Sequence, residues 1–105
     1  MTIRELQKRV GDFSREHHLD SNPEYKILDT VSELGEVSKE ILKMTDYGKK
    51  SMVFKDEVGL ELGDLLYSVV TIANSLNVDL EEAVENALKK YGERLKKGSP
   101  GSEND

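Results

Sequence analysis

The strongest constraint on this chain is a nearly repeated hexapeptide, SELGEV at positions 32–37 and LELGDL at positions 60–65. Each copy places two carboxylates three positions apart, and on a helix residues i and i+3 lie on one face. Two such helices packed together would gather four carboxylates, and this concentration of negative charge needs a cation. The repeat therefore predicts two paired helices that share an acidic site.

Helical periodicity extends over most of the chain. Thr2 with Glu5, and Asp79 with Glu82, have the spacing of capping boxes, which begin helices. The alternation of apolar and polar residues that is typical of an exposed strand is absent from the sequence. The apolar spacing predicts four helices, at about 3–17, from 23 to just before 47, 58–76 and 80–95. We therefore expect an all-α fold.

The length of 105 residues suits one domain, which we place at residues 1–97. Residues 98–105 are polar and rich in Gly, Pro and Ser, so we expect a disordered C-terminal tail. A helical domain of this size buries a modest share of its surface and often completes its core with another copy. We expect a homo-oligomer, dimer or tetramer, whose core is shared between subunits.

Composition excludes several classes of protein. The chain has no cysteine, which removes disulfides, thiolate zinc sites and a cysteine nucleophile. No apolar run approaches the roughly 20 residues of a membrane span, and the N-terminus lacks a signal-peptide hydrophobic region. A net charge of −6 argues against a broad nucleic-acid surface. We expect a cytoplasmic protein that binds neither membrane nor nucleic acid.

The acids of the repeat belong to two longer stripes beside the apolar faces of their helices. Like charges at this spacing destabilise a helix, so a metal or nearby cations must compensate them. The candidate ligands are all oxygens, which favours Mg²⁺, with Mn²⁺ as a substitute. Gly35 and Gly63 lower helix propensity and predict the close approach of another backbone. The stripes comprise Asp29, Glu33, Glu36 and Glu40 on one helix, and Glu57, Glu61, Asp64 and Ser68 on the other.

These motifs resemble a known family. Glu33-x-x-Glu36 and Glu61-x-x-Asp64 are similar to the bipartite magnesium motif of the all-α nucleoside triphosphate pyrophosphohydrolases, most closely the MazG-like branch. The resemblance covers roughly residues 24–95 and includes the helix start at 77–83 and a Lys-aromatic-x-x-Arg segment at 90–94. It implies a four-helix MazG-like bundle.

The resemblance also implies residue roles. Glu33, Glu36, Glu61 and Asp64 would hold Mg²⁺, and the reaction would convert a nucleoside triphosphate to a monophosphate and pyrophosphate, with clearance of non-standard nucleotides as one role. Two basic side chains would approach the triphosphate, although cations near a helix C-terminus also complement the helix dipole. Either Glu36 or Glu40 would orient the attacking water, and the sequence does not separate metal ligand from base. The two basic residues are Lys90 and Arg94.

The sequence leaves two alternatives open. A non-catalytic helical module could keep the acidic stripes as an electrostatic surface for a nucleotide or a partner protein. The related phosphoribosyl-ATP pyrophosphohydrolase shares the general architecture, but residues 61–64 resemble the MazG-like pattern better. Two departures from that pattern are Ser32 and Leu60, which stand where many members double the first glutamate of each motif.

Overall fold

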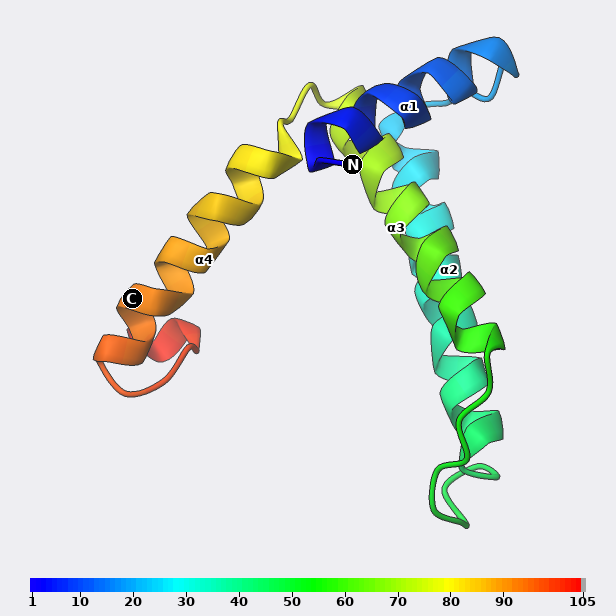
Figure 1. Ribbon diagram of the computed structural model, residues 1–105, viewed down its shortest axis with the longest axis vertical. Helices are drawn as coiled ribbons and strands as arrows, with labels where there is room; N and C mark the ends of the chain where they lie inside the picture. Colours follow the sequence, from blue (N-terminus) through cyan, green and yellow to red (C-terminus); the bar gives the residue numbers. More distant parts are fainter. Residues whose placement is uncertain (105) are drawn as a thin grey trace.

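The computed structural model describes residues 1–104 as an all-α chain (Figure 1). Its helices are α1 (Ile3–Glu16), α2 (Pro23–Met44), α3 (Glu57–Ser75) and α4 (Leu80–Lys96), followed by a short 3₁₀ helix, η1 (Ser102–Asn104). The predicted all-α class is confirmed, and each helix lies within one to three residues of its expected ends.

Local sequence signals account for the helix ends. The Thr2 hydroxyl accepts from the backbone N–H of Glu5, and the Glu5 carboxylate accepts from that of Thr2, so the predicted capping box is present. The Asp79 carboxylate accepts from the first-turn N–H groups of α4. After α2 the chain turns through Gly48, whose φ of +83° glycine adopts without strain.

Two limbs make up the overall shape (Figure 1). Helices α2 and α3 run antiparallel and pack along each other, and α1 crosses one end of this pair while contacting the start of α4. Helix α4 then diverges from the α2–α3 pair, as the second limb of an inverted V. No residue of α4 is buried. The chain therefore presents α4 as an arm held mainly at its N-terminal end.

The buried apolar core of one chain is small. It contains Val10, Met44, Val70 and Ala73. In contrast, large side chains of the three long helices remain open, for example Leu34 of α2 at 53%, Leu62 of α3 at 50% and Leu88 of α4 at 61%. Soluble monomers rarely expose apolar surface on this scale. The apolar faces that the sequence assigns to a core thus lie uncovered in a single chain.

The C-terminal segment folds back along α4. Lys97 donates from Nζ to the backbone oxygen of Asn104 at 3.0 Å, and Arg94 donates to the backbone oxygen of Pro100 at 3.2 Å. Position 105 lies outside the described residues, and disorder of the tail stays a prediction. Across residues 1–104, no helix is long and apolar enough to cross a membrane.

Candidate functional site

Three acids of the repeated element meet at the seam between α2 and α3. Glu33 comes from α2, and Glu61 and Asp64 come from α3. Each offers one carboxylate oxygen, and these oxygens lie within 4.8 Å of one another. Glu33 and Glu61 are half-buried, whereas Asp64 is exposed. The packing of α2 on α3 therefore brings three of the four predicted ligands together.

The electrostatics of this cluster are unfavourable without a cation. Desolvation raises the pKa of the Glu61 carboxyl above its usual range, and the charge of Asp64 raises it further. The carboxylates of Glu36, Glu33 and Glu40 contribute to the same rise in the Glu61 pKa. Within residues 1–104, no salt bridge reaches Glu33, Glu61 or Asp64. In the described part of the chain, these three carboxylates therefore gather negative charge without an ion-pair partner.

The donor set fits a hard divalent cation. All three groups are carboxylates from two different helices, and such oxygen ligands suit Mg²⁺ or Mn²⁺. One side remains open, since Asp64 is exposed, which would leave space for water or a phosphate oxygen. The arrangement can therefore hold a metal and still admit a substrate.

The other two candidate acids differ in their surroundings. Glu36 is exposed and is not part of the close group of three, although its negative charge contributes to the raised pKa of Glu61. Glu40 is only 8% exposed, and Lys43 one turn later lies 3.4 Å from its carboxylate. Glu36 therefore faces solvent, whereas Glu40 is enclosed and its charge is partly neutralised by Lys43. Both lie on α2, toward its C-terminal end from Glu33.

The two predicted phosphate-binding cations lie on α4. Lys90 Nζ stands 5.0 Å from the centre of the Tyr91 ring, and the Arg94 guanidinium carbon stands 5.7 Å from it. Because α4 diverges from α2 and α3, one chain does not bring these cations to its own carboxylates (Figure 1). A site that uses all of them needs α4 of another chain or a large movement of this arm.

The expectation for the two central glycines is wrong within one chain. A Cβ built on Gly35 or Gly63 would meet nothing within 4 Å. No neighbouring backbone of the same chain requires a glycine at either place. Both glycines are exposed in the single chain, so no packing contact occupies the space beside them.

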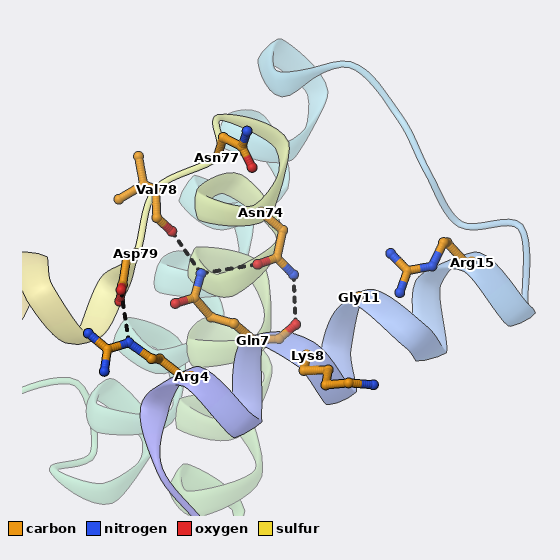
Figure 2. Close-up of a pocket in the computed structure, with 9 residues that line it drawn as sticks. All are labelled: Arg4, Gln7, Lys8, Gly11, Arg15, Asn74, Asn77, Val78 and Asp79. Carbon is orange, nitrogen blue, oxygen red and sulfur yellow. Dashed lines mark hydrogen bonds and ion pairs between the residues drawn. The ribbon is translucent and has the colours of Figure 1, made fainter.

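A polar cavity of about 430 Å³ lies elsewhere, between α1 and the end of α3 (Figure 2). It excludes the carboxylate cluster and has Gln7 and Asn74 in its wall. The helical periodicity of the sequence does not predict this junction. The available signal was Gln7 itself, a polar residue between Ile3 and Val10 on the inward face of α1.

The comparisons with known proteins agree on one family. The MazG nucleotide pyrophosphohydrolase domain matches residues 22–99. The chain is 30% identical over 95 residues to an uncharacterized protein, YpjD, of Bacillus subtilis, a match that covers 88% of this chain and 81% of that protein. It is 49% identical over 41 residues to the nucleoside triphosphate pyrophosphohydrolase/pyrophosphatase MazG of Thermotoga maritima, over 39% of this chain and only 16% of that one.

Solved structures give the same result for the fold. The Bacillus-conserved MazG protein, a nucleotide pyrophosphohydrolase, superposes with a TM-score of 0.73 at 28% identity, covering 87% of this chain and 89% of the other. The iMazG protein from Vibrio DAT 722 superposes with a TM-score of 0.61 at 33% identity, covering 91% and 97%. The four-helix arrangement is therefore shared with solved MazG proteins.

Proposed function

Since the chain belongs to the MazG nucleotide pyrophosphohydrolase family, we propose that it cleaves a nucleoside triphosphate between the α- and β-phosphates. The products would be a nucleoside monophosphate and pyrophosphate. The observation that carries this proposal is the meeting of Glu33, Glu61 and Asp64 within 4.8 Å, with no salt bridge to any of the three among residues 1–104. A triphosphate has the same need for a cation, because its own negative charge must be neutralised before water can attack.

Glu33, Glu61 and Asp64 would hold Mg²⁺, with Glu36 as a fourth ligand or as a ligand through water. When bound, Mg²⁺ neutralises phosphate charge and polarises the phosphoryl oxygens. The raised pKa of Glu61 supports this role, because a group whose charge is disfavoured by its neighbours gains from a bound cation. Mn²⁺ would substitute, since it accepts the same oxygen ligands.

Either Glu36 or Glu40 would orient the attacking water. The carboxylate would accept a hydrogen bond from the water and take its proton, while the water oxygen bonds to phosphorus and the bond to the leaving pyrophosphate breaks. Glu40 is the more enclosed of the two, with Lys43 beside it, whereas Glu36 is open to solvent. Separate Glu36→Gln and Glu40→Gln variants would distinguish metal ligand from base. Loss of turnover with Mn²⁺ affinity retained identifies the base.

Lys90 and Arg94 would stabilise the triphosphate and the leaving pyrophosphate through charge-assisted hydrogen bonds. Because α4 leads away from the carboxylates of its own chain, we propose that these cations act on the site of a neighbouring copy (Figure 1). The exposed apolar faces of α2, α3 and α4 support such an oligomer, since a second copy would cover them.

A nucleotide hydrolysis panel with purified protein tests the proposal. Standard and modified (d)NTPs are incubated with Mg²⁺, with Mn²⁺ and with EDTA, and turnover is measured for the wild type and for Glu61→Gln. The proposal expects metal-dependent turnover of at least one nucleotide and its loss in the variant. Turnover that persists in EDTA, or full activity of the variant, would refute the metal assignment.

A further inference from the structure

Helix α1 is hydrogen-bonded to the connection between α3 and α4 through the side-chain amide of Gln7 (Figure 2). Gln7 Nε2 donates to the backbone oxygen of Val78 at 2.8 Å and to Oδ1 of Asn74 at 3.1 Å. Gln7 Oε1 accepts from the backbone N–H of Leu80 at 2.9 Å. Both N–H donors and the oxygen of one side chain are therefore used. Only a carboxamide offers donors and an acceptor in this planar arrangement.

Asn74 also donates a hydrogen bond to Gln7. Its Nδ2 donates to the backbone oxygen of Gln7 at 3.0 Å, so the two amides join α1 to the last turn of α3 in both directions. Both side chains are partly buried. Amide hydrogen bonds are directional, so the two paired amides favour one relative placement of α1 and the last turn of α3. We call the hydrogen bonds that join Gln7 to Asn74, Val78 and Leu80 the amide latch.

An ion pair beside the latch holds the first turn of α4. Arg4 Nε lies 2.9 Å from the Asp79 carboxylate, and Arg4 Nη1 lies 2.7 Å from that of Glu81. These contacts are more exposed than the amide latch, so they are weaker anchors. Asp79 also caps α4 through its other oxygen. The start of α4 is thus tied to α1 at adjacent residues.

Within residues 1–104, the C-terminal segment folds back on the far end of α4 and bonds to Arg94 there. None of the residues of α4 is buried, and the packing of α4 within the chain is against α1. The connection that precedes it is short and passes through Asn77 with a φ of +60°, in the left-handed region. A small rotation at this connection would swing the far end of α4, where Lys90 and Arg94 lie, through a large distance. The latch is therefore placed where it controls the direction of the arm.

We propose that Gln7 is a positioning residue that sets the direction of α4 and so delivers Lys90 and Arg94 to the carboxylates of a neighbouring copy. The second half of this inference rests on the proposed function, whereas the first half concerns the geometry of one chain alone. Gln7 acts through α4 and touches neither metal nor substrate.

The decisive variant is Gln7→Glu, which keeps the size of the side chain. It preserves an acceptor for the Leu80 N–H but replaces the Nε2 donor with an acceptor that faces Val78 O and Asn74 Oδ1. A Gln7→Met variant removes the hydrogen bonds without adding charge, and serves if the charged variant does not fold. The matched control is Asn22→Asp, the same carboxamide-to-carboxylate change at an exposed residue whose side chain makes no capping hydrogen bond.

The direction of α4 is measured by electron–electron double resonance in the assembled protein. The chain has no cysteine, so two labels can be attached after Lys39→Cys on α2 and Glu93→Cys on α4, both exposed positions. Dilution of the labelled chain with unlabelled wild type restricts the signal to distances within one chain. We expect one narrow distance distribution for the latch-intact protein and for Asn22→Asp. We expect a broadened or displaced one for Gln7→Glu and Gln7→Met, and an unchanged distribution in both would overturn the proposal.

The consequence for catalysis is a separate readout. Gln7→Glu should raise the nucleotide KM about tenfold or more, as loss of a charge-assisted phosphate contact does, while Mn²⁺ affinity stays at the wild-type value. Equal loss of Mn²⁺ and nucleotide binding would indicate general unfolding and would overturn the positioning role. A wild type that turns over no nucleotide would contradict the proposed function alone, because the distance measurement still tests the latch.

Discussion

The Glu61→Gln substitution should leave thermal stability unchanged or higher without metal, and should lower it relative to the wild type when metal is present. Without metal, the substitution removes a negative charge that Asp64, Glu36, Glu33 and Glu40 all disfavour, so the variant should melt no lower than the wild type. With metal, the wild type gains binding energy that the variant lacks. The order of the two melting temperatures should therefore change when Mg²⁺ or Mn²⁺ is added.

The size of this change follows from linkage. A metal at 100 times its Kd stabilises the native state by about 2.7 kcal/mol. Loss of one of three clustered carboxylates should weaken binding by about 100-fold or more, since even supporting residues around a metal cost about 10 to 100-fold. At the same metal concentration the variant then gains only about 0.4 kcal/mol. At about 4–8 °C per kcal/mol, the metal-induced rise in melting temperature should fall from more than 10 °C to about 2–3 °C.

The assay is thermal unfolding by circular dichroism at fixed chain concentration, with EDTA and with a series of Mg²⁺ or Mn²⁺ concentrations. The control is Glu85→Gln, an exposed carboxylate on α4 outside the acidic seam, which should respond to metal like the wild type. An equal metal-induced shift in Glu61→Gln and the wild type would refute the reasoning. So would a metal-free variant that melts well below the wild type, because the cluster would then be stabilising without a cation.

Lys90→Gln should raise the nucleotide KM without changing Mn²⁺ affinity, as measured by steady-state kinetics and titration calorimetry; a change in Mn²⁺ affinity would contradict its assignment to phosphate. Leu88→Glu, which places a charge on an exposed apolar face of α4, should lower the oligomeric mass seen in light scattering, and an unchanged mass would argue against the shared core. The side-chain hydrogen bond from Arg4 lowers the pKa of Asp79 in the folded protein. The Asp79 carboxylate therefore stabilises the fold at pH values above its unfolded pKa of about 3.9. This stabilisation is lost as the pH falls through the lower pKa of the folded state. The stability difference between wild type and Asp79→Asn should be present at pH 7 and decrease as the pH falls below the unfolded pKa of about 3.9 in an acid series of melts, whereas a pH-independent difference would exclude this origin.

The helices were readable from the sequence because their signals are local. Thr2 and Asp79 cap the helices that they were expected to begin, and Pro23 is the first residue of α2. Spacing within each helix also placed Glu61 and Asp64 on one face, which the structure brings next to Glu33. Periodicity and capping act over one or two turns, so a single sequence contains the information.

Local sequence signals do not predict how elements far apart in the chain are placed relative to one another. The direction of α4 depends on Gln7 meeting Asn74 and the backbone around Val78, contacts that join positions far apart in the chain. Periodicity could assign the apolar faces to a core but could not say which chain covers them. Gly35 was likewise expected to admit a backbone that one chain does not provide. These features depend on tertiary and quaternary contacts, for which a local pattern carries no signal.

Phosphorus NMR of the products formed from a hydrolysable triphosphate, in the presence of the protein and Mg²⁺, tests the proposed reaction most directly. We expect nucleoside monophosphate and pyrophosphate in equal amounts, with no build-up of nucleoside diphosphate and no reaction when EDTA replaces Mg²⁺. Release of a nucleoside diphosphate and inorganic phosphate would contradict the proposed reaction, and so would cleavage that proceeds equally well without a divalent metal.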